Sequence, residues 1–223
     1  MTTIQKTTYK DQVIGYVYEC ILDGRHLPGG QIKEALLAKE LGISRAPVRE
    51  ALKELTVNGI IDYRPQVGSF IALLPPHQIR DVYTTRGVLE GYAIMSTREQ
   101  FTTGDIEKLQ ALVARMRHEA ELGNRKMVVQ VGDDFHSLLI SRNRNLQLAE
   151  YMERLRLKLH VLFCRYWSDL YSPAEIGNRH QRIVTSLLSG DPAAIEQTVR
   201  RHYSESGDRI AAISPPNGQW NEA

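Results

Sequence analysis

The stretch SRAPVREALKELTVN, residues 44–58, decides the fold of the N-terminal part of the chain. Its apolar side chains recur at i, i+4 and i+7, which is the spacing of one face of an α-helix, at Val48, Leu52 and Leu55. Ser44 stands where an N-cap is needed, since its hydroxyl can accept a hydrogen bond from a first-turn amide that has no partner inside the helix. Gly59 then favours a helix end. The stretch therefore predicts a short helix that buries one narrow face.

A row of basic residues follows one edge of this predicted helix, because Arg45, Arg49 and Lys53 are spaced four residues apart. Positive charge near a helix N-terminus is unfavourable for the helix itself, since the helix dipole is already positive there. The row suits a polyanion that docks against the helix, although a solvated basic edge would show the same spacing. The segments on either side decide between these two interpretations.

The segment before this helix predicts a helix-turn-helix. Residues 8–23 and 31–41 both have a helical spacing of apolar residues. In the second of these helices, the residues expected to face inward are Ile32, Leu36 and Leu37. Gly42 ends that helix just before Ser44 opens the next one. Two helices joined by a tight, glycine-containing turn form a helix-turn-helix.

The segment after Gly59 predicts a β-hairpin, because the apolar period changes there from 3.6 to about two. Residues 60–63 and 67–71 are expected to be its strands. The tip carries Arg64 and Gln66, and Gly68 would let the backbone approach a phosphate closely. A hairpin that directly follows a helix-turn-helix is a wing, so residues 1–74 are predicted to form a winged helix-turn-helix DNA-binding domain.

Residues 28–30, 38–42 and 44–52, together with Gly59 and Gly68, closely resemble the DNA-binding domain of the GntR family of bacterial transcription regulators. The resemblance implies a double-stranded DNA operator as partner, contacted by Ser44, Arg45, Pro47, Arg49 and Gly68. Arginine suits this role because its guanidinium can bond a guanine edge bidentately, which discriminates between bases by about 1–3 kcal/mol for each pair. From the basic row and the wing tip we expect further contacts from Lys53, Arg64 and Gln66.

Composition places the chain among ordinary globular proteins, with 42% hydrophobic and 24% charged residues. Residues 1–75 carry 9 Lys and Arg against 8 Asp and Glu, so a DNA-binding surface has to be a local cluster. No run of 18 apolar residues occurs, which predicts no membrane span. The first residues lack the apolar core of a secretion signal. We therefore expect a cytoplasmic protein.

After Leu74-Pro75-Pro76, which breaks any continuing strand, the sequence predicts helices only. Six are expected between residues 77 and 213, where they would form an antiparallel, all-α effector-binding and dimerisation domain. The fifth of these should begin with a capping box, because Ser172 is followed three residues later by Glu175. Residues 214–223 are expected to be a disordered tail.

This helical part resembles the FCD effector-binding domain of the FadR subfamily, in its six-helix, VanR-like form. The matching residues are Arg86, Leu89, Glu90, residues 134–136, Asn145, His180, residues 190–191 and His202. The resemblance implies a small-molecule effector contacted by Arg86, Glu90 and Asn145. Arg86 could clamp a carboxylate bidentately, so we expect a carboxylate effector. Alternatively, Arg86 pairs with Glu90, four residues further along the helix.

Domains of this class often hold a divalent metal with three histidines and an aspartate, and His136, His180 and His202 match the histidines. Each lies on a different predicted helix, as a metal site in a helical bundle requires. Gly132 occupies the position where the resemblance implies the aspartate, and Asp133, on nearly the same face, is expected to replace it. Imidazole ligands favour zinc or nickel. The alternative is that each histidine is an ordinary hydrogen-bonded residue.

The hypothesis that combines these features is a homodimeric, ligand-responsive transcriptional repressor that binds a palindromic operator. A metal-dependent enzyme and a protein-binding helical scaffold are the alternatives. Against an enzyme, the sequence contains no nucleophile motif, no phosphate-binding loop and no His-Glu-x-x-His pair.

Overall fold

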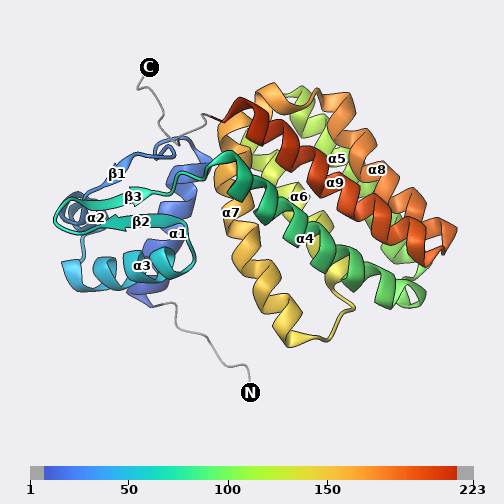
Figure 1. The fold of residues 1–223 in the computed structure, drawn as a ribbon, viewed down its shortest axis with the longest axis horizontal. Coiled ribbons are helices and arrows are strands. Elements are labelled where there is room, and N and C mark those ends of the chain that lie inside the picture. The colour runs from blue at the N-terminus through green and yellow to red at the C-terminus, as the bar shows by residue number, and fades with distance from the viewer. Residues whose placement is uncertain (1–7, 215–223) are drawn as a thin grey trace. The chain divides into compact units, whose positions relative to one another are not determined.

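The structure is a computed structural model that describes residues 8–214; within this range, the side chains of residues 157 and 164–169 lie outside the description. The chain divides into two compact units, one up to Leu74 and the other from Pro75 (Figure 1). The tail predicted to be disordered lies outside the described residues, except for Ser214. That residue forms the C-cap of the last helix, and its hydroxyl donates a hydrogen bond to the Ile210 carbonyl.

The first unit packs three helices against a small antiparallel sheet in which the strands lie in the order β1-β3-β2. Strand β3 lies between the other two because Phe70 pairs with both Gln31 of β1 and Asp62 of β2. The elements of this unit are α1 (Tyr9–Leu22), β1 (Gln31–Ile32), α2 (Glu34–Leu41), α3 (Arg45–Val57), β2 (Ile61–Arg64) and β3 (Gly68–Ile71).

The predicted face of α3 is buried, because Val48, Leu52 and Leu55 are each at most 2% exposed. This face packs against α1, α2 and β2. Burial of aliphatic side chains stabilises a fold by about 1.5–3 kcal/mol per residue, so the apolar stripe is sufficient to hold α3 in place. The opposite edge of α3, which carries the basic row, is thereby left in solvent.

Two details of the helix-turn-helix prediction are wrong. Gln31 and Ile32 belong to β1 rather than to the second helix, because the extended backbone of Lys33 delays the start of α2 to Glu34. Leu36, which was expected to face inward, is 54% exposed. Of the two neighbouring leucines, only Leu37 is buried. Ser44 is the N-cap of α3 as predicted, but its side chain makes no capping hydrogen bond.

The second unit is a bundle of six α-helices, as expected, with one short 3₁₀ turn in the described residues. The capping box of Ser172 and Glu175 is present at the start of α8, and Thr102 and Asp105 form a second one at the start of α5. The elements are α4 (Pro76–Thr97), η1 (Arg98–Gln100), α5 (Thr103–Glu121), α6 (Arg125–Ile140), α7 (Leu146–Leu170), α8 (Pro173–Ser189) and α9 (Pro192–Ile213).

Helices α4 and α9 lie side by side along much of their length (Figure 1). Glycines permit this close approach: a Cβ atom added at Gly87 would lie 3.2 Å from the Cα of Arg200, and one at Gly207 would lie 2.7 Å from the Cβ of Tyr83. A protein interior leaves no room for such overlap. The close contact brings polar side chains of α4 against those of α9 inside the bundle.

Candidate functional site

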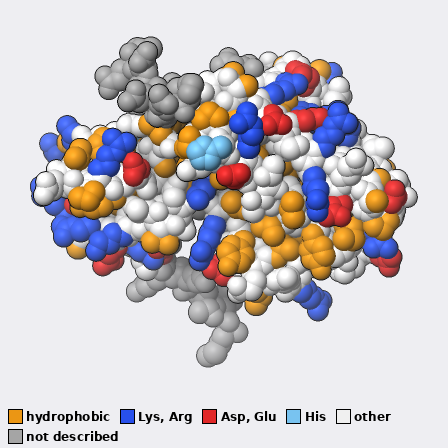
Figure 2. Space-filling model, in the orientation of Figure 1, with side chains coloured by type: hydrophobic (Ala, Val, Ile, Leu, Met, Phe, Trp, Pro, Cys, Tyr) orange, Lys and Arg blue, Asp and Glu red, His pale blue; other side chains and the backbone are white. Residues whose placement is uncertain are grey.

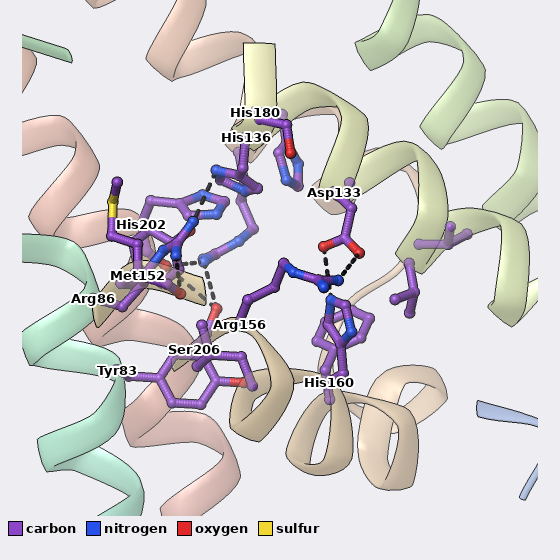
Figure 3. Close-up of a pocket in the computed structure, with 18 of the residues that line it drawn as sticks. Tyr83, Arg86, Asp133, His136, Met152, Arg156, His160, His180, His202 and Ser206 are labelled. Carbon is purple, nitrogen blue, oxygen red and sulfur yellow. Dashed lines mark hydrogen bonds and ion pairs between the residues drawn. The ribbon is translucent and has the colours of Figure 1, made fainter. Parts of the chain in front are cut away.

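A cavity of about 170 Å³ lies inside the helical unit. All six helices α4–α9 contribute side chains to its wall, and its lining combines apolar side chains with polar and charged ones. Pockets that combine apolar walls with a few converging polar groups are typical of small-molecule sites. Two groups of polar side chains converge on this cavity, one around three histidines and one around Asp133 (Figure 3).

The first group consists of His136 from α6, His180 from α8 and His202 from α9. One ring nitrogen from each histidine can be chosen so that the three atoms all lie within 4.8 Å of one another. The ring centroids of His180 and His202 are 4.8 Å apart, and His136 lies 5.5 and 5.3 Å from them. The three histidines that the sequence predicted as ligands are therefore brought together.

The hydrogen bonds of two of these rings identify the nitrogen that remains available. Nδ1 of His180 lies 2.7 Å from the Ile176 carbonyl, and Nδ1 of His136 lies 2.5 Å from a Glu90 oxygen. A carbonyl only accepts hydrogen bonds, and so does an ionised carboxylate, so both Nδ1 atoms carry the proton. In the neutral form of each ring, Nε2 then has a free lone pair. In metal sites, a hydrogen bond from the other ring nitrogen to a carbonyl or carboxylate fixes the tautomer and the orientation of a histidine ligand in this way.

His202 shows a different feature, because its buried Nδ1 has no hydrogen-bond partner among the described residues. Buried polar atoms in proteins are nearly always satisfied, and the exceptions mark a missing water, ion or ligand. A ring nitrogen without a partner, in a group of three histidines that offer nitrogens within 4.8 Å of one another, is what a bound divalent cation would satisfy. The donor set of this group therefore fits a metal ion of the kind that imidazole favours.

The environment of these histidines keeps two of them neutral. Burial, with a further effect from His136, lowers the pKa of His180 to about 3. Burial and the neighbouring His180 likewise hold the pKa of His202 well below its usual value. Only the neutral ring can donate its lone pair to a metal, so both side chains are in the binding-competent form at pH 7.

Behind His136 lies a buried ion pair between Arg86 and Glu90, which are 3% and 0% exposed. The guanidinium Nη2 of Arg86 lies 2.7 Å from Glu90 Oε2, and the Tyr203 hydroxyl donates to the same oxygen at 2.9 Å. Although burial opposes ionisation, His136 and Arg86 lower the pKa of Glu90 to about 2. The pairing of Arg86 with Glu90 that the sequence left as an alternative is therefore present. Arg86 also lines the cavity and donates to the Met152 carbonyl.

Two predicted site residues lie apart from the histidines. The carboxylate of Asp133 accepts hydrogen bonds from Arg156 Nη1 at 3.0 Å and from His160 Nε2 at 2.7 Å, and it is not part of the histidine group (Figure 3). Asn145 is the N-cap of α7, where its side chain accepts a hydrogen bond from the Leu148 amide, and it does not line the cavity. At Gly132, an added Cβ would meet only Met116 Cε, at 3.9 Å.

Arg156 and His160 line the cavity but were not singled out from the sequence. Their spacing of four residues on α7 was the available signal, because such a pair lies on one helix face. Tyr203 was also missed. Its position next to His202 placed it near the predicted ligands, but nothing in the sequence indicated that its hydroxyl would turn toward Glu90.

The predicted DNA-contacting residues form an exposed surface on the first unit. Arg45, Arg49 and Lys53 are all exposed along α3. Arg49 pairs with Glu34, whose carboxylate lies 3.6 Å from Nε. Ser44 is exposed as well, whereas Pro47 in the first turn of α3 is half-buried.

The wing tip is a tight turn between β2 and β3, closed by a hydrogen bond of 3.1 Å from the Val67 amide to the Arg64 carbonyl. Gln66 adopts a φ of 64°, and within residues 8–214 it is the one non-glycine residue with positive φ. Gly68 has a φ of 131°, and a side chain there would crowd the Gln31 amide at 3.0 Å. The turn keeps both Arg64 and Gln66 exposed.

Two family models match the chain: "Bacterial regulatory proteins, gntR family" over residues 9–71 and "FCD domain" over residues 81–205. A relative from Paenarthrobacter nicotinovorans, named "Probable D-xylose utilization operon transcriptional repressor", is 26% identical over 98% of this chain and 92% of its own length. The "HTH-type transcriptional repressor RspR" of Escherichia coli K12 is 29% identical over 86% of this chain and 85% of its own length.

Solved structures show the same fold. "E. coli McbR/YncC" matches with a TM-score of 0.74 and 21% identity, over 89% of this chain and 94% of that one. A "putative transcriptional regulator GntR from Rhodococcus sp. RHA1" matches with a TM-score of 0.75 and 21% identity, over 92% and 98%. In the part of the chain that the structure describes, no helix is both long and apolar enough to cross a membrane.

Proposed function

The chain belongs to the gntR family of bacterial regulatory proteins and carries an FCD domain, and from this premise we propose that it is an effector-responsive repressor that binds an operator as a homodimer. Proteins of this family are transcriptional regulators, so the chain is not an enzyme. The names of two relatives describe repressors, which supports repression rather than activation.

The observation that carries DNA binding is the exposed basic row of Arg45, Arg49 and Lys53, presented by a helix whose other face is buried. A recognition helix needs this division, since one face must hold the helix in the domain while the other reaches base edges in the major groove. Arg64 and Gln66 at the wing tip would contact the adjacent backbone. The exposed Ser44 hydroxyl, which is free of a capping role, would bind a phosphate.

A second copy of the chain is the proposed partner of an apolar surface on the helical unit. Val88 and Tyr92 of α4 are 43% and 49% exposed, and Leu146 and Tyr151 of α7 are 80% and 54% exposed. Helices α4 and α7 pack together, and Figure 2 shows hydrophobic side chains gathered on this face. An exposed apolar patch commonly marks an interaction site.

Sedimentation velocity measurements test the dimer. Tyr92→Arg should sediment as a monomer, whereas Leu188→Arg on α8 should sediment as a dimer.

We further propose that His136, His180 and His202 hold a divalent ion, zinc or nickel, and that Asp133 does not take part. When bound, the ion would offer a positive centre to an anionic effector. Glu90 would fix the orientation of His136, and Arg86 would hold Glu90 ionised, so both act as positioning residues for the site. Elemental analysis of protein purified without chelator should find about one ion per chain, and His180→Gln should lose it.

Selection of bound fragments from random duplex DNA tests the operator proposal. We expect a short inverted repeat, and an affinity whose logarithm falls steeply with the logarithm of salt concentration. Arg49→Ala should relax the base preference at one position in each half-site, by a factor of about ten or more. Arg154→Ala removes an arginine of similar exposure from the helical unit and serves as the matched control. If the selection enriches no DNA sequence at moderate salt, the proposal is refuted.

A further inference from the structure

The second polar group in the cavity consists of Asp133 from α6 with Glu153, Arg156 and His160 from α7, and we call it the α7 cluster. Arg156 is held from two sides: Nη1 lies 3.0 Å from Asp133, while Nε and Nη2 lie 2.8 and 2.5 Å from the two oxygens of Glu153. His160 donates to the other oxygen of Asp133 at 2.7 Å. All four side chains line the cavity.

The α7 cluster retains hydrogen-bonding capacity after these contacts. A guanidinium has five N–H groups, and the bonds to Asp133 and Glu153 use three of those of Arg156. Each oxygen of Asp133 accepts one bond among the described residues, although a carboxylate oxygen can accept two. The cluster thus offers spare donors and spare acceptors side by side. A hydroxyl group, which both donates and accepts, matches this pattern.

The charge of the α7 cluster disfavours an anion at this end of the cavity. Two carboxylates, Asp133 and Glu153, surround the single guanidinium of Arg156, and the pKa of Asp133 is lowered by His160 and Arg156 despite its burial. The carboxylates therefore stay ionised at neutral pH. An effector carboxylate placed here would meet like charges, which repel when they are close and partly desolvated.

The histidine end of the cavity suits an anion through the proposed divalent ion, which would supply positive charge there. No carboxylate belongs to the histidine group in the described residues, and the nearby Glu90 is already neutralised by Arg86. Apolar side chains, Val129 of α6 and Leu159 of α7 among them, also line the cavity. A ligand that fits this lining has an anionic group, an apolar body and a hydroxyl group.

We propose that the α7 cluster binds a hydroxyl group of the effector whose anionic end the proposed function assigns to the histidines. The proposal rests on the proposed effector function of the same cavity. Asp133 and His136 are three residues apart on α6, so their Cβ atoms are separated by about 5–6 Å. The ligand is therefore short, comparable to a four- to six-carbon chain or to one aromatic ring.

Calorimetric titration of the full-length protein, with and without one equivalent of Zn²⁺, tests the proposal with matched acids. The pairs are butanoate with 4-hydroxybutanoate, hexanoate with 6-hydroxyhexanoate, and benzoate with 4-hydroxybenzoate. A site built to hydrogen-bond a hydroxyl strongly rejects analogues that lack it. In at least one pair we expect the hydroxylated acid to bind tenfold or more tightly than its parent.

Variants of the α7 cluster test which residues cause the preference. Asp133→Asn keeps the shape of the side chain but removes the charge and half of the acceptor capacity, so the preference should fall to threefold or less while the parent acid binds unchanged. Arg156→Lys, which keeps the charge but removes the guanidinium fork, should reduce the preference too, and it replaces the first variant if that one fails to fold. Arg154→Ala, on the same helix outside the cavity, should leave the preference intact.

Three results would overturn the proposal: no acid binds, no hydroxylated acid binds more tightly than its parent, or both cluster variants keep the wild-type preference. These results concern the ligand alone, because the titration contains no DNA. Enrichment of an inverted repeat from random DNA would then leave the regulatory function standing. Failure of that selection would refute the regulatory function whatever the titration shows.

Discussion

Acid should destabilise the metal-free protein through His180, because its pKa lies at about 3 in the folded chain. In the unfolded chain, the pKa of the same ring is about 6.5. Between these two values the unfolded state binds a proton that the folded state excludes. The contribution of the neutral ring to stability is therefore complete above pH 6.5, and it declines as the pH falls toward 3.

The size of this effect follows from the separation of the two pKa values. Each pH unit below the unfolded pKa lowers the free energy of unfolding by about 1.4 kcal/mol for each excluded proton. Between pH 7.5 and pH 5.0, His180 should therefore cost the protein about 2 kcal/mol. His202 shifts in the same direction for the same reason, burial, and adds to the loss.

Urea denaturation in the presence of a chelator at pH 7.5 and pH 5.0 measures this loss. Replacement by a side chain that does not titrate, His180→Gln, should make the decline smaller by about 2 kcal/mol, because the excluded proton no longer exists. His118 on α5 is exposed, so His118→Gln should decline in parallel with the wild type and serves as the matched control. A parallel decline of His180→Gln and the wild type would refute the reasoning.

Three glycine substitutions give further predictions. Gly132→Asp adds a carboxylate one turn before His136, where an added Cβ has room, and should tighten Zn²⁺ binding by about tenfold or more in a competition assay with a chelating dye. Gly207→Ala places a Cβ 2.7 Å from that of Tyr83 and should lower the free energy of unfolding by about 1–3 kcal/mol in urea. Gly15→Ala meets nothing within 4 Å in the middle of α1, so the same measurement should show a gain of about 0.5–1 kcal/mol.

The helices could be predicted from the sequence because their apolar spacing and end signals agree. The capping box at Ser172 and the prolines at residues 75 and 76 mark boundaries that the structure reproduces within a residue or two. Strand β1 could not be predicted in the same way. It is two residues long, and only its pairing with β3, nearly forty residues further along the chain, holds Gln31 and Ile32 extended. Pairing over such a distance leaves no local periodicity in the sequence.

The convergence of the three histidines was predictable only through the family resemblance. His136, His180 and His202 lie on three helices, and the packing angles that bring them together are properties of the bundle. The spacing of Asp133 from His136 did not determine which side chains its carboxylate contacts. A position three residues before His136 lies on nearly the same helix face, yet the carboxylate turns toward Arg156 and His160, since each of these two donors on α7 binds one of its oxygens.

The spacing of Arg86 and Glu90 predicts their ion pair but not its burial, and burial decides what the pair contributes. The spacing of four residues predicts an ion pair, but on a solvent-exposed helix such a pair contributes only a few tenths of a kcal/mol. Here both groups are buried, and removal of one partner from such a pair typically costs about 3–5 kcal/mol, since the other charge remains desolvated. Glu90 also holds His136 at 2.5 Å. The pair therefore links the stability of the α4–α9 contact to the orientation of a proposed metal ligand, so a mutation of Arg86 would disturb the fold and the site together.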